Sequence, residues 1–179
     1  MRTPSNSRSD PSVYGCILTV LWGCAAPGGA SERVIVAWQE ALARQGRRTE
    51  LGEDLIIGYS FYISDSEEQA IREATPFFEE NMKMFAPLGF VRGLSEEQID
   101  AIADPTRARD ANLPTLRDAV EAGSWLVGPP ERIVAALREL QEAYPGLEEI
   151  NVGLPVGTPE RVIVDQLGRF SRDVMPAFR

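Results

Sequence analysis

The sequence predicts an α/β domain with parallel strands, and three observations support this fold class. From residue 31 onward, the chain repeats one order of signals: a helix N-cap, an amphipathic helix, a breaker and an apolar run. This alternation is typical of βα units. The length of 179 residues, 44% of them apolar, suffices for one domain with a sizeable core. We find no sequence repeat with a period of about 20 to 50 residues, which argues against a solenoid.

The first predicted helix covers residues 31–45, and Gly46 ends it. Its apolar face carries Val34, Trp38, Ala41 and Leu42. A buried strand follows at residues 54–64, which are rich in Ile, Tyr and Phe. A capping box at residues 64–67 then begins a second helix that runs to about Phe85, with a bend expected at Pro76.

Residues 86–123 break this rhythm and are interpreted as an insertion with two short helices, one starting at Ser95 and one following Pro114. A short apolar run, 125–127, leads to a helix that starts at 128–131. A strand at 147–156 precedes the last helix. The predicted apolar face of that last helix consists of Ile163, Leu167, Phe170, Val174 and Phe178.

The composition disfavours several classes of function. The 18 Lys and Arg residues against 27 Asp and Glu residues give a net charge of −9, which repels nucleic acid and anionic membrane surfaces. Histidine is absent, so Ser-His-Asp and Cys-His nucleophile schemes are excluded. Cys16 and Cys24, the two cysteines, fit no zinc or redox motif. We therefore expect no metal site.

Residues 1–30 are expected to form an atypical segment, separate from a domain at 31–179. A polar start rich in Ser and Pro gives way to an apolar run at 13–26 that is too short to span a bilayer. The segment has some features of a signal peptide, but Asp10 interrupts its basic region and Trp22 stands where a small residue is required. We favour a short buried strand or a segment foreign to the parent gene, and we expect a cytoplasmic protein.

Four segments carry a family resemblance. They are Tyr59–Ala70, Leu126–Val134, Glu149–Val156 and Phe170–Phe178. In order and spacing they resemble the seventh strand with its helix, the "VGtPeeV" helix start, the eighth strand and the "F.eeVmPaf" ending of the luciferase-like monooxygenases. The resemblance covers about residues 34–179 and lies in the C-terminal part of that family.

The resemblance implies a (β/α)8 barrel, which typically needs about 250 residues. Only two strands are predicted firmly, with a third in residues 13–22, so we expect an incomplete, truncated barrel. The family implies a flavin- or deazaflavin-dependent oxidoreductase, a monooxygenase of a small organic substrate. Its FMN or deazaflavin would be supplied in reduced form by another protein. The units that carry the family's polar residues near the flavin are absent, so no catalytic residue can be assigned.

A second interpretation is a non-catalytic α/β fragment that serves as an interaction or dimerisation module. Half a barrel exposes strand edges and apolar surface that another chain must cover. On either interpretation the chain is expected to self-associate.

Candidate binding residues come from the loops at the C-terminal ends of strands, where barrels hold their sites. These loops are Ser64–Asp65, the insertion, and Pro155–Thr158. The insertion resembles a mobile lid, and Arg107 and Arg109, with Arg92, are its candidate contacts to a phosphate or sulfonate. The simpler interpretation is a solvated loop in which these arginines pair with acids. Those acids are Asp104, Asp110 and Asp118.

Three further features have favoured structural interpretations. Tyr59, Phe61 and Tyr62 could line a flavin pocket, but core packing is commoner for strand aromatics. The helix start at 128–131 could hold an anion, yet two prolines remove donors and Glu131 adds negative charge. Three acids that flank strands are expected to be caps or surface groups: Asp54, Asp65 and Glu149.

Overall fold

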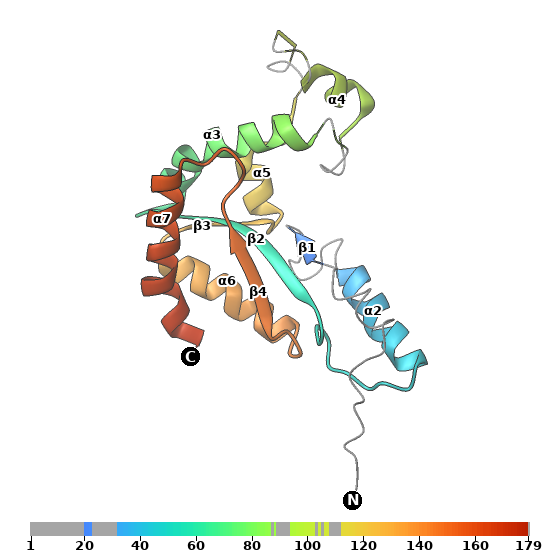
Figure 1. The fold of residues 1–179 in the computed structure, drawn as a ribbon. Helices are drawn as coiled ribbons and strands as arrows, with labels where there is room; N and C mark the ends of the chain where they lie inside the picture. Colours follow the sequence, from blue (N-terminus) through green and yellow to red (C-terminus); the bar gives the residue numbers. More distant parts are fainter. Residues whose placement is uncertain are drawn as a thin grey trace, which may run out of the picture.

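The computed structural model describes residues 20–22, 32–86, 88, 94–102, 104, 106–107 and 112–178. Figure 1 shows the arrangement of its elements. In chain order they are β1 (Val20–Trp22), α2 (Glu32–Arg44), β2 (Ile56–Ile63), α3 (Glu67–Phe85), α4 (Glu96–Ile102), α5 (Leu116–Glu121), β3 (Trp125–Gly128), α6 (Pro130–Ala143), β4 (Glu149–Gly153), α7 (Glu160–Arg169), a π-helical turn η2 (Phe170–Val174) and a 3-10 turn η3 (Met175–Phe178).

The four described strands form one parallel sheet built around β2. β1 and β4 both pair with the start of β2, so they lie on opposite edges of β2. β3 pairs with the second half of β2, Ser60–Ile63. The strands predicted at 54–64 and 147–156 are adjacent and parallel, as the βα alternation implies, with Ile57 opposite Ile150. The α/β class with parallel strands is thus confirmed, and an incomplete barrel remains a prediction with which this sheet is consistent.

One face of the sheet carries the larger part of the core. Four alternate residues of β2, from Ile57 to Ile63, point toward α6 and the π-helical turn η2. Phe61 packs against Phe170 of η2, with ring centroids 4.9 Å apart. The remaining fully buried partners on this face include Ile133, Leu137, Leu140, Tyr144 and Val174.

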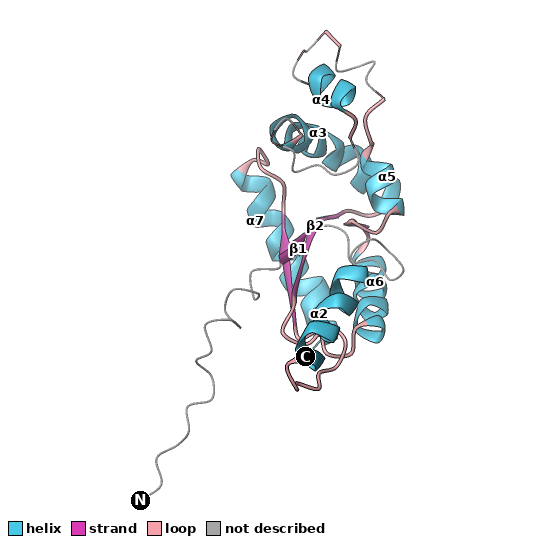
Figure 2. Ribbon diagram, turned by 90° about the vertical axis from the view of Figure 1, so that its right-hand side faces the viewer, coloured by secondary structure: helices cyan, strands magenta, loops and turns pink. Residues whose placement is uncertain are grey.

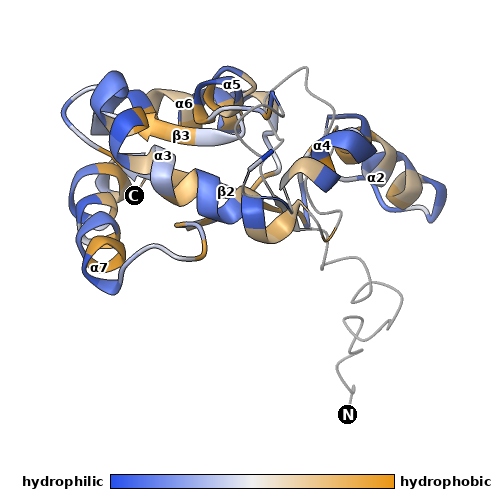
Figure 3. Cartoon of the chain, turned by 90° about the horizontal axis from the view of Figure 1, so that it is seen from above, coloured by the Kyte–Doolittle hydropathy of each residue, from blue (hydrophilic) through white to orange (hydrophobic). Residues whose placement is uncertain are grey.

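The opposite face is covered by α3 and α5 near β3. Tyr62 of β2 packs there with Trp125 and Val127 of β3 and with the apolar stripe of α3. Figure 2 shows helices on both sides of the strands, and Figure 3 shows β3, in orange, between α3 and α6. Helices therefore bury both faces of β2, whose residues from Ile57 to Ile63 are all buried.

The local signals largely place the elements as expected. The predicted capping box at 64–67 is displaced by two residues: Ser66, not Ser64, caps α3 by accepting a hydrogen bond from the Gln69 backbone N–H at 3.2 Å. The helix continues through Pro76. Both insertion helices form, α4 after Ser95 and α5 with a capping box between Thr115 and Asp118. In the described part of the chain, no helix has the length and apolarity that crossing a membrane requires.

The last helix corrects one prediction. Phe170 and Val174 are buried, but Leu167 and Phe178, expected on the same face, are 43% and 40% exposed. Gln166 is buried in their place. The helix is rotated relative to its apolar stripe because the Gln166 side chain hydrogen-bonds to the end of β2.

Candidate functional site

The C-terminal ends of β2 and β3 are held side by side by two contacts. The Ser64 backbone N–H donates to the Gly128 carbonyl at 3.1 Å, and Arg132 of α6 forms a 2.7 Å ion pair with Glu67 of α3. Gly128 has a φ of 120°, and a Cβ there would lie 3.0 Å from Cδ of Arg132. Glycine therefore allows the Arg132 side chain to cross the strand end and reach the next helix.

A second group of contacts converges on the carboxylate of Glu73 on α3. Gln69 Nε2 donates to one carboxylate oxygen at 2.8 Å and Ser64 Oγ donates to the other at 3.2 Å. The Tyr62 hydroxyl is also hydrogen-bonded to Glu73. Burial, followed by the charges of Glu73 and Asp165, raises the pKa of Tyr62. The Tyr62 phenol therefore stays protonated near neutral pH and acts as a donor.

The far edge of β2, opposite β3, is closed by α7. The Ile63 N–H donates to Gln166 Oε1 at 2.6 Å, and Gln166 Nε2 donates back to the Ile63 carbonyl at 3.0 Å. Arg169 Nη1 donates to the same carbonyl at 2.8 Å, and Nη2 lies 3.8 Å from the exposed carboxylate of Asp65. A half-buried guanidinium thus stands at the end of the central strand, with donors to spare for an anionic group.

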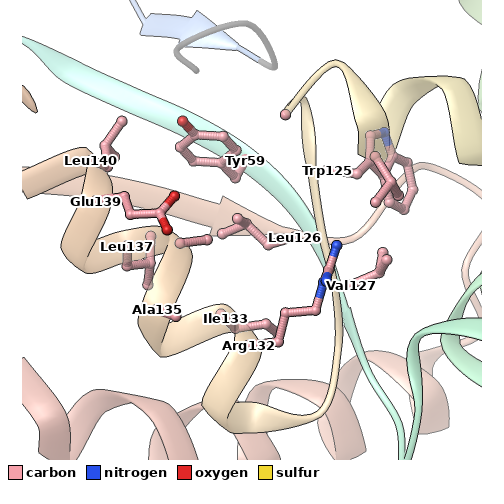
Figure 4. Close-up of a pocket in the computed structure, with 13 residues that line it drawn as sticks. Tyr59, Trp125, Leu126, Val127, Arg132, Ile133, Ala135, Leu137, Glu139 and Leu140 are labelled. Carbon is pink, nitrogen blue, oxygen red and sulfur yellow. The ribbon is translucent and has the colours of Figure 1, made fainter. Parts of the chain in front are cut away.

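A pocket of about 310 Å³ lies on the β3 side of the sheet, between β2, β3 and α6. Tyr59 and Leu126 form part of its apolar wall. Figure 4 shows Glu139 and Arg132 extending from α6 on either side of Leu126. Because Arg132 also pairs with Glu67, it connects the pocket to the strand ends. The volume is at the lower end for small-molecule sites, which begin at about 300 Å³.

The charges around the strand ends limit what can bind there. The acids are Asp65, Glu67, Glu73 and Asp165, and the cations are Arg132 and Arg169. Four carboxylates against two guanidinium groups make the cluster net negative. Arg132 is held by Glu67 at 2.7 Å, whereas Arg169 lies 3.8 Å from Asp65, so Arg169 is the more open of these two cations for an anionic group. Among the residues described, no three His, Cys, Asp or Glu side chains are grouped to hold a metal ion.

The insertion shows only part of the predicted lid. Arg107 is exposed, and its backbone N–H donates to the Asp104 carbonyl. Hydrogen bonds from Thr106 hold the pKa of Asp104 below its usual value, and the charge of Arg107 adds to this effect. Three other named residues, Arg92, Arg109 and Asp110, lie outside the described residues. Asp118 is engaged by Thr115 in the α5 cap. Cofactor contact by Arg107 and Arg109 remains a prediction.

The other sequence candidates have structural partners. Tyr59 and Phe61 belong to the core, while Tyr62 is buried with its hydroxyl in the Glu73 group. Thr158 is buried, and its hydroxyl donates to the Pro155 carbonyl at 2.7 Å, so this loop is a closed turn. Pro129 and Pro130 begin α6 with no side-chain cap. The strand-flanking acids behave as surface groups: Asp54 pairs with Arg47 at 2.6 Å, Asp65 faces Arg169, and Glu149 is exposed.

Three residues of this site were missed at the level of sequence: Glu73, Gln166 and Arg169. Each is a polar residue inside a helix, where a solvent-facing position is the usual expectation. One signal was available for Gln166, which lies four residues before Phe170 and eight before Val174, on the buried stripe. Gln166 and Arg169 contact Ile63 of β2, which the sequence could not predict. Glu73 contacts Ser64 after β2 as well as Gln69 of its own helix.

A family model described as luciferase-like monooxygenase matches residues 16–145, more than half of the chain. The chain belongs to this family. The family inferred from the sequence is thereby confirmed; of the four segments, Tyr59–Ala70 and Leu126–Val134 lie within the match. A search of curated proteins gives no significant match.

Solved structures with similar folds include proteins whose descriptions name FMN or coenzyme F420. A monooxygenase from Streptomyces bottropensis has 16% identity and a TM-score of 0.53, covering 83% of this chain and 38% of that one. The oxygenating constituent of 3,6-diketocamphane monooxygenase from Pseudomonas putida, in complex with FMN, has 19% identity and a TM-score of 0.54, with 83% and 40% covered.

A third similar structure is the coenzyme F420-dependent tetrahydromethanopterin reductase of Methanopyrus kandleri. It has 23% identity and a TM-score of 0.50, with 83% of this chain and 42% of that chain covered. At these identities the likeness shows the fold alone. The chain spans about two fifths of the length of these proteins.

Proposed function

We propose that the chain acts in a flavin- or deazaflavin-dependent oxidoreduction, the monooxygenation of a small organic substrate. The observation that carries this proposal is the polar cluster around Ser64, Glu73 and Arg169 at the C-terminal end of the central parallel strand. Barrels of this class hold their sites at that end. Family membership supplies the cofactor class, FMN or a deazaflavin, which another protein would reduce.

Arg169 is the described residue that best fits an anionic part of such a cofactor. Its guanidinium is half-buried and fixed by the Ile63 carbonyl, so it would meet a phosphate with little loss of side-chain freedom. Tyr62 and Ser64 hold their hydroxyl protons toward Glu73, which orders the polar wall beside it. Arg107 and Arg109 are proposed as lid contacts. When bound, the flavin would supply the electrons for the reaction.

The proposal is tested by fluorescence titration of the purified chain with FMN and with the deazaflavin, each oxidised and reduced. Saturable binding of one of them is expected. Arg169→Ala should weaken FMN binding about tenfold or more, because it removes a charge-assisted hydrogen bond. Riboflavin, which lacks the phosphate, should be bound equally by both forms. Arg138→Ala, an exposed arginine on α6, serves as the matched control.

The outcomes separate the interpretations. Weaker binding of FMN and riboflavin alike in Arg169→Ala would show a structural role for Arg169 instead of a phosphate contact. An absence of saturable binding in any redox state would overturn the proposal and favour the interaction module. Arg107→Ala and Arg109→Ala should each weaken cofactor binding if the insertion closes over it, and should leave binding unchanged if it is a solvated loop.

A further inference from the structure

The strand β4 differs from its neighbours in the sheet. All four residues of β3 and seven of the eight residues of β2 are buried, whereas β4 contains no buried residue. Within the described part of the chain, β4 pairs only with β2, so its other edge has no described strand as a partner. Ile150 and Val152 are half-exposed on the face that continues the main core. An edge strand with exposed backbone groups and exposed apolar residues is a template for strand pairing.

An apolar groove of about 500 Å³ runs along this strand. Ile150 and Val152 line it together with α6 and the C-terminal helix. In Figure 1, α7 stands beside β4 on the side away from β2. The side chains of Leu167, Met175 and Phe178 that line this groove are 43%, 45% and 40% exposed. They add apolar surface that pairing along β4 alone would not bury.

The residues of β4 are self-complementary about Asn151. In an antiparallel pair of two copies, Asn151 would face its own counterpart, Ile150 would face Val152, and Glu149 would face Gly153. Apolar residues then meet on the groove face and polar residues on the other face. No two like charges lie opposite each other, and the two Asn151 amides can donate to each other. A pairing shifted by one residue would set apolar side chains against polar ones.

We propose that β4 pairs antiparallel with β4 of a second copy of this chain about a two-fold axis at Asn151, with the groove walls of both copies buried in the interface. A two-fold interface of this type uses the same patch on each copy and closes the assembly at two. It joins two four-stranded sheets into one. The proposal is independent of cofactor binding, since it uses no residue of the strand-end cluster.

The test is a charge swap at the axis, measured by sedimentation over a concentration series. The wild-type chain should sediment as a dimer. Asn151→Lys and Asn151→Asp should each be monomeric, because each places two like charges face to face, while Asn151 is exposed and its replacement leaves the core intact. An equimolar mixture of the two variants should restore the dimer. Gln45→Lys, an exposed position after α2, should remain dimeric.

A covalent measurement checks the register. Asn151→Cys, in a background with Cys16 and Cys24 changed to Ser, should form a disulfide-linked dimer on mild oxidation. Directly opposed residues in antiparallel pairs have Cα atoms about 4.5 to 5.5 Å apart, which a disulfide spans. A wild-type monomer, a dimer that persists in Asn151→Lys, or a mixture that does not reassociate would each overturn the proposal. Persistence in Asn151→Lys would point to another edge, such as β3.

Discussion

The side chain of Gln166 provides the sharpest test of how α7 is joined to the sheet. It is 2% exposed and hydrogen-bonds both backbone groups of Ile63, itself fully buried. Gln166→Leu keeps most of the side-chain volume but leaves the Ile63 N–H without a partner. The Ile63 carbonyl keeps its bond from Arg169. The loss is therefore one orphaned donor, and we expect the free energy of unfolding to fall by about 2 kcal/mol.

A double-mutant cycle with Arg169→Ala separates this account from a general packing defect. Each single change leaves the Ile63 carbonyl with one donor, whereas the double change leaves it with none. The double variant should therefore lose about 1 kcal/mol more than the sum of the singles. Urea denaturation followed by circular dichroism measures these free energies, with Gln45→Leu as an exposed control. A loss below about 0.5 kcal/mol in Gln166→Leu, or strict additivity in the cycle, would refute the reasoning.

Three further predictions concern the strand ends. Ser66→Ala removes the N-cap of α3 and should lower the free energy of unfolding by about 1 kcal/mol in urea, whereas an unchanged midpoint would contradict the cap. Gly128→Ala places a Cβ on a backbone with a φ of 120°, close to Arg132, and should lower the free energy of unfolding by about 1 to 3 kcal/mol. A variant as stable as the wild type would show that the strand end relaxes freely. The pKa of Tyr62 in the folded protein is raised by burial and by Glu73. The neutral phenol therefore stabilises the fold fully at pH values below the pKa of an unfolded tyrosine, and this contribution is lost as the pH rises through the pKa of folded Tyr62. The stability difference between wild type and Tyr62→Phe should therefore shrink in alkaline solution, and an absorbance titration should lose one phenol that ionises above pH 10.0; a difference independent of pH would contradict this.

Sequence reasoning reached the helices and their order and the strands β2 and β4, whereas β3 was predicted only as a short apolar run. Local signals such as the proline start of α6 act within one turn of chain, so they can be read without the fold. The start of α3 was also predicted, but its cap is Ser66 and not Ser64. The parallel pairing of β2 with β4 followed from βα alternation, and it is confirmed. The family was reached from four short segments in order, and the match over residues 16–145 confirms it.

The composition of the site was beyond the sequence. Gln166 and Arg169 lie on α7 and contact Ile63 across 103 and 106 residues of chain, whereas Glu73 of α3 contacts Ser64 only nine residues away. Helical periodicity indicates which face of a helix is apolar, but it does not indicate which backbone group lies opposite a polar residue. Arg107, chosen because it is a cation on a loop, is exposed beside Asp104 in the structure.

The sequence by itself determined the α/β class, the helix limits near their caps and the family, because these depend on short-range chemistry and on the order of segments. Only the tertiary structure decided that Gln166 turns inward while Leu167 and Phe178 turn outward. The physical reason is that a buried backbone N–H and C=O at the end of β2 must be paired, and the amide of Gln166 pairs both at once. That requirement outweighs the apolar stripe of α7 and leaves its exposed side chains along the open edge of β4.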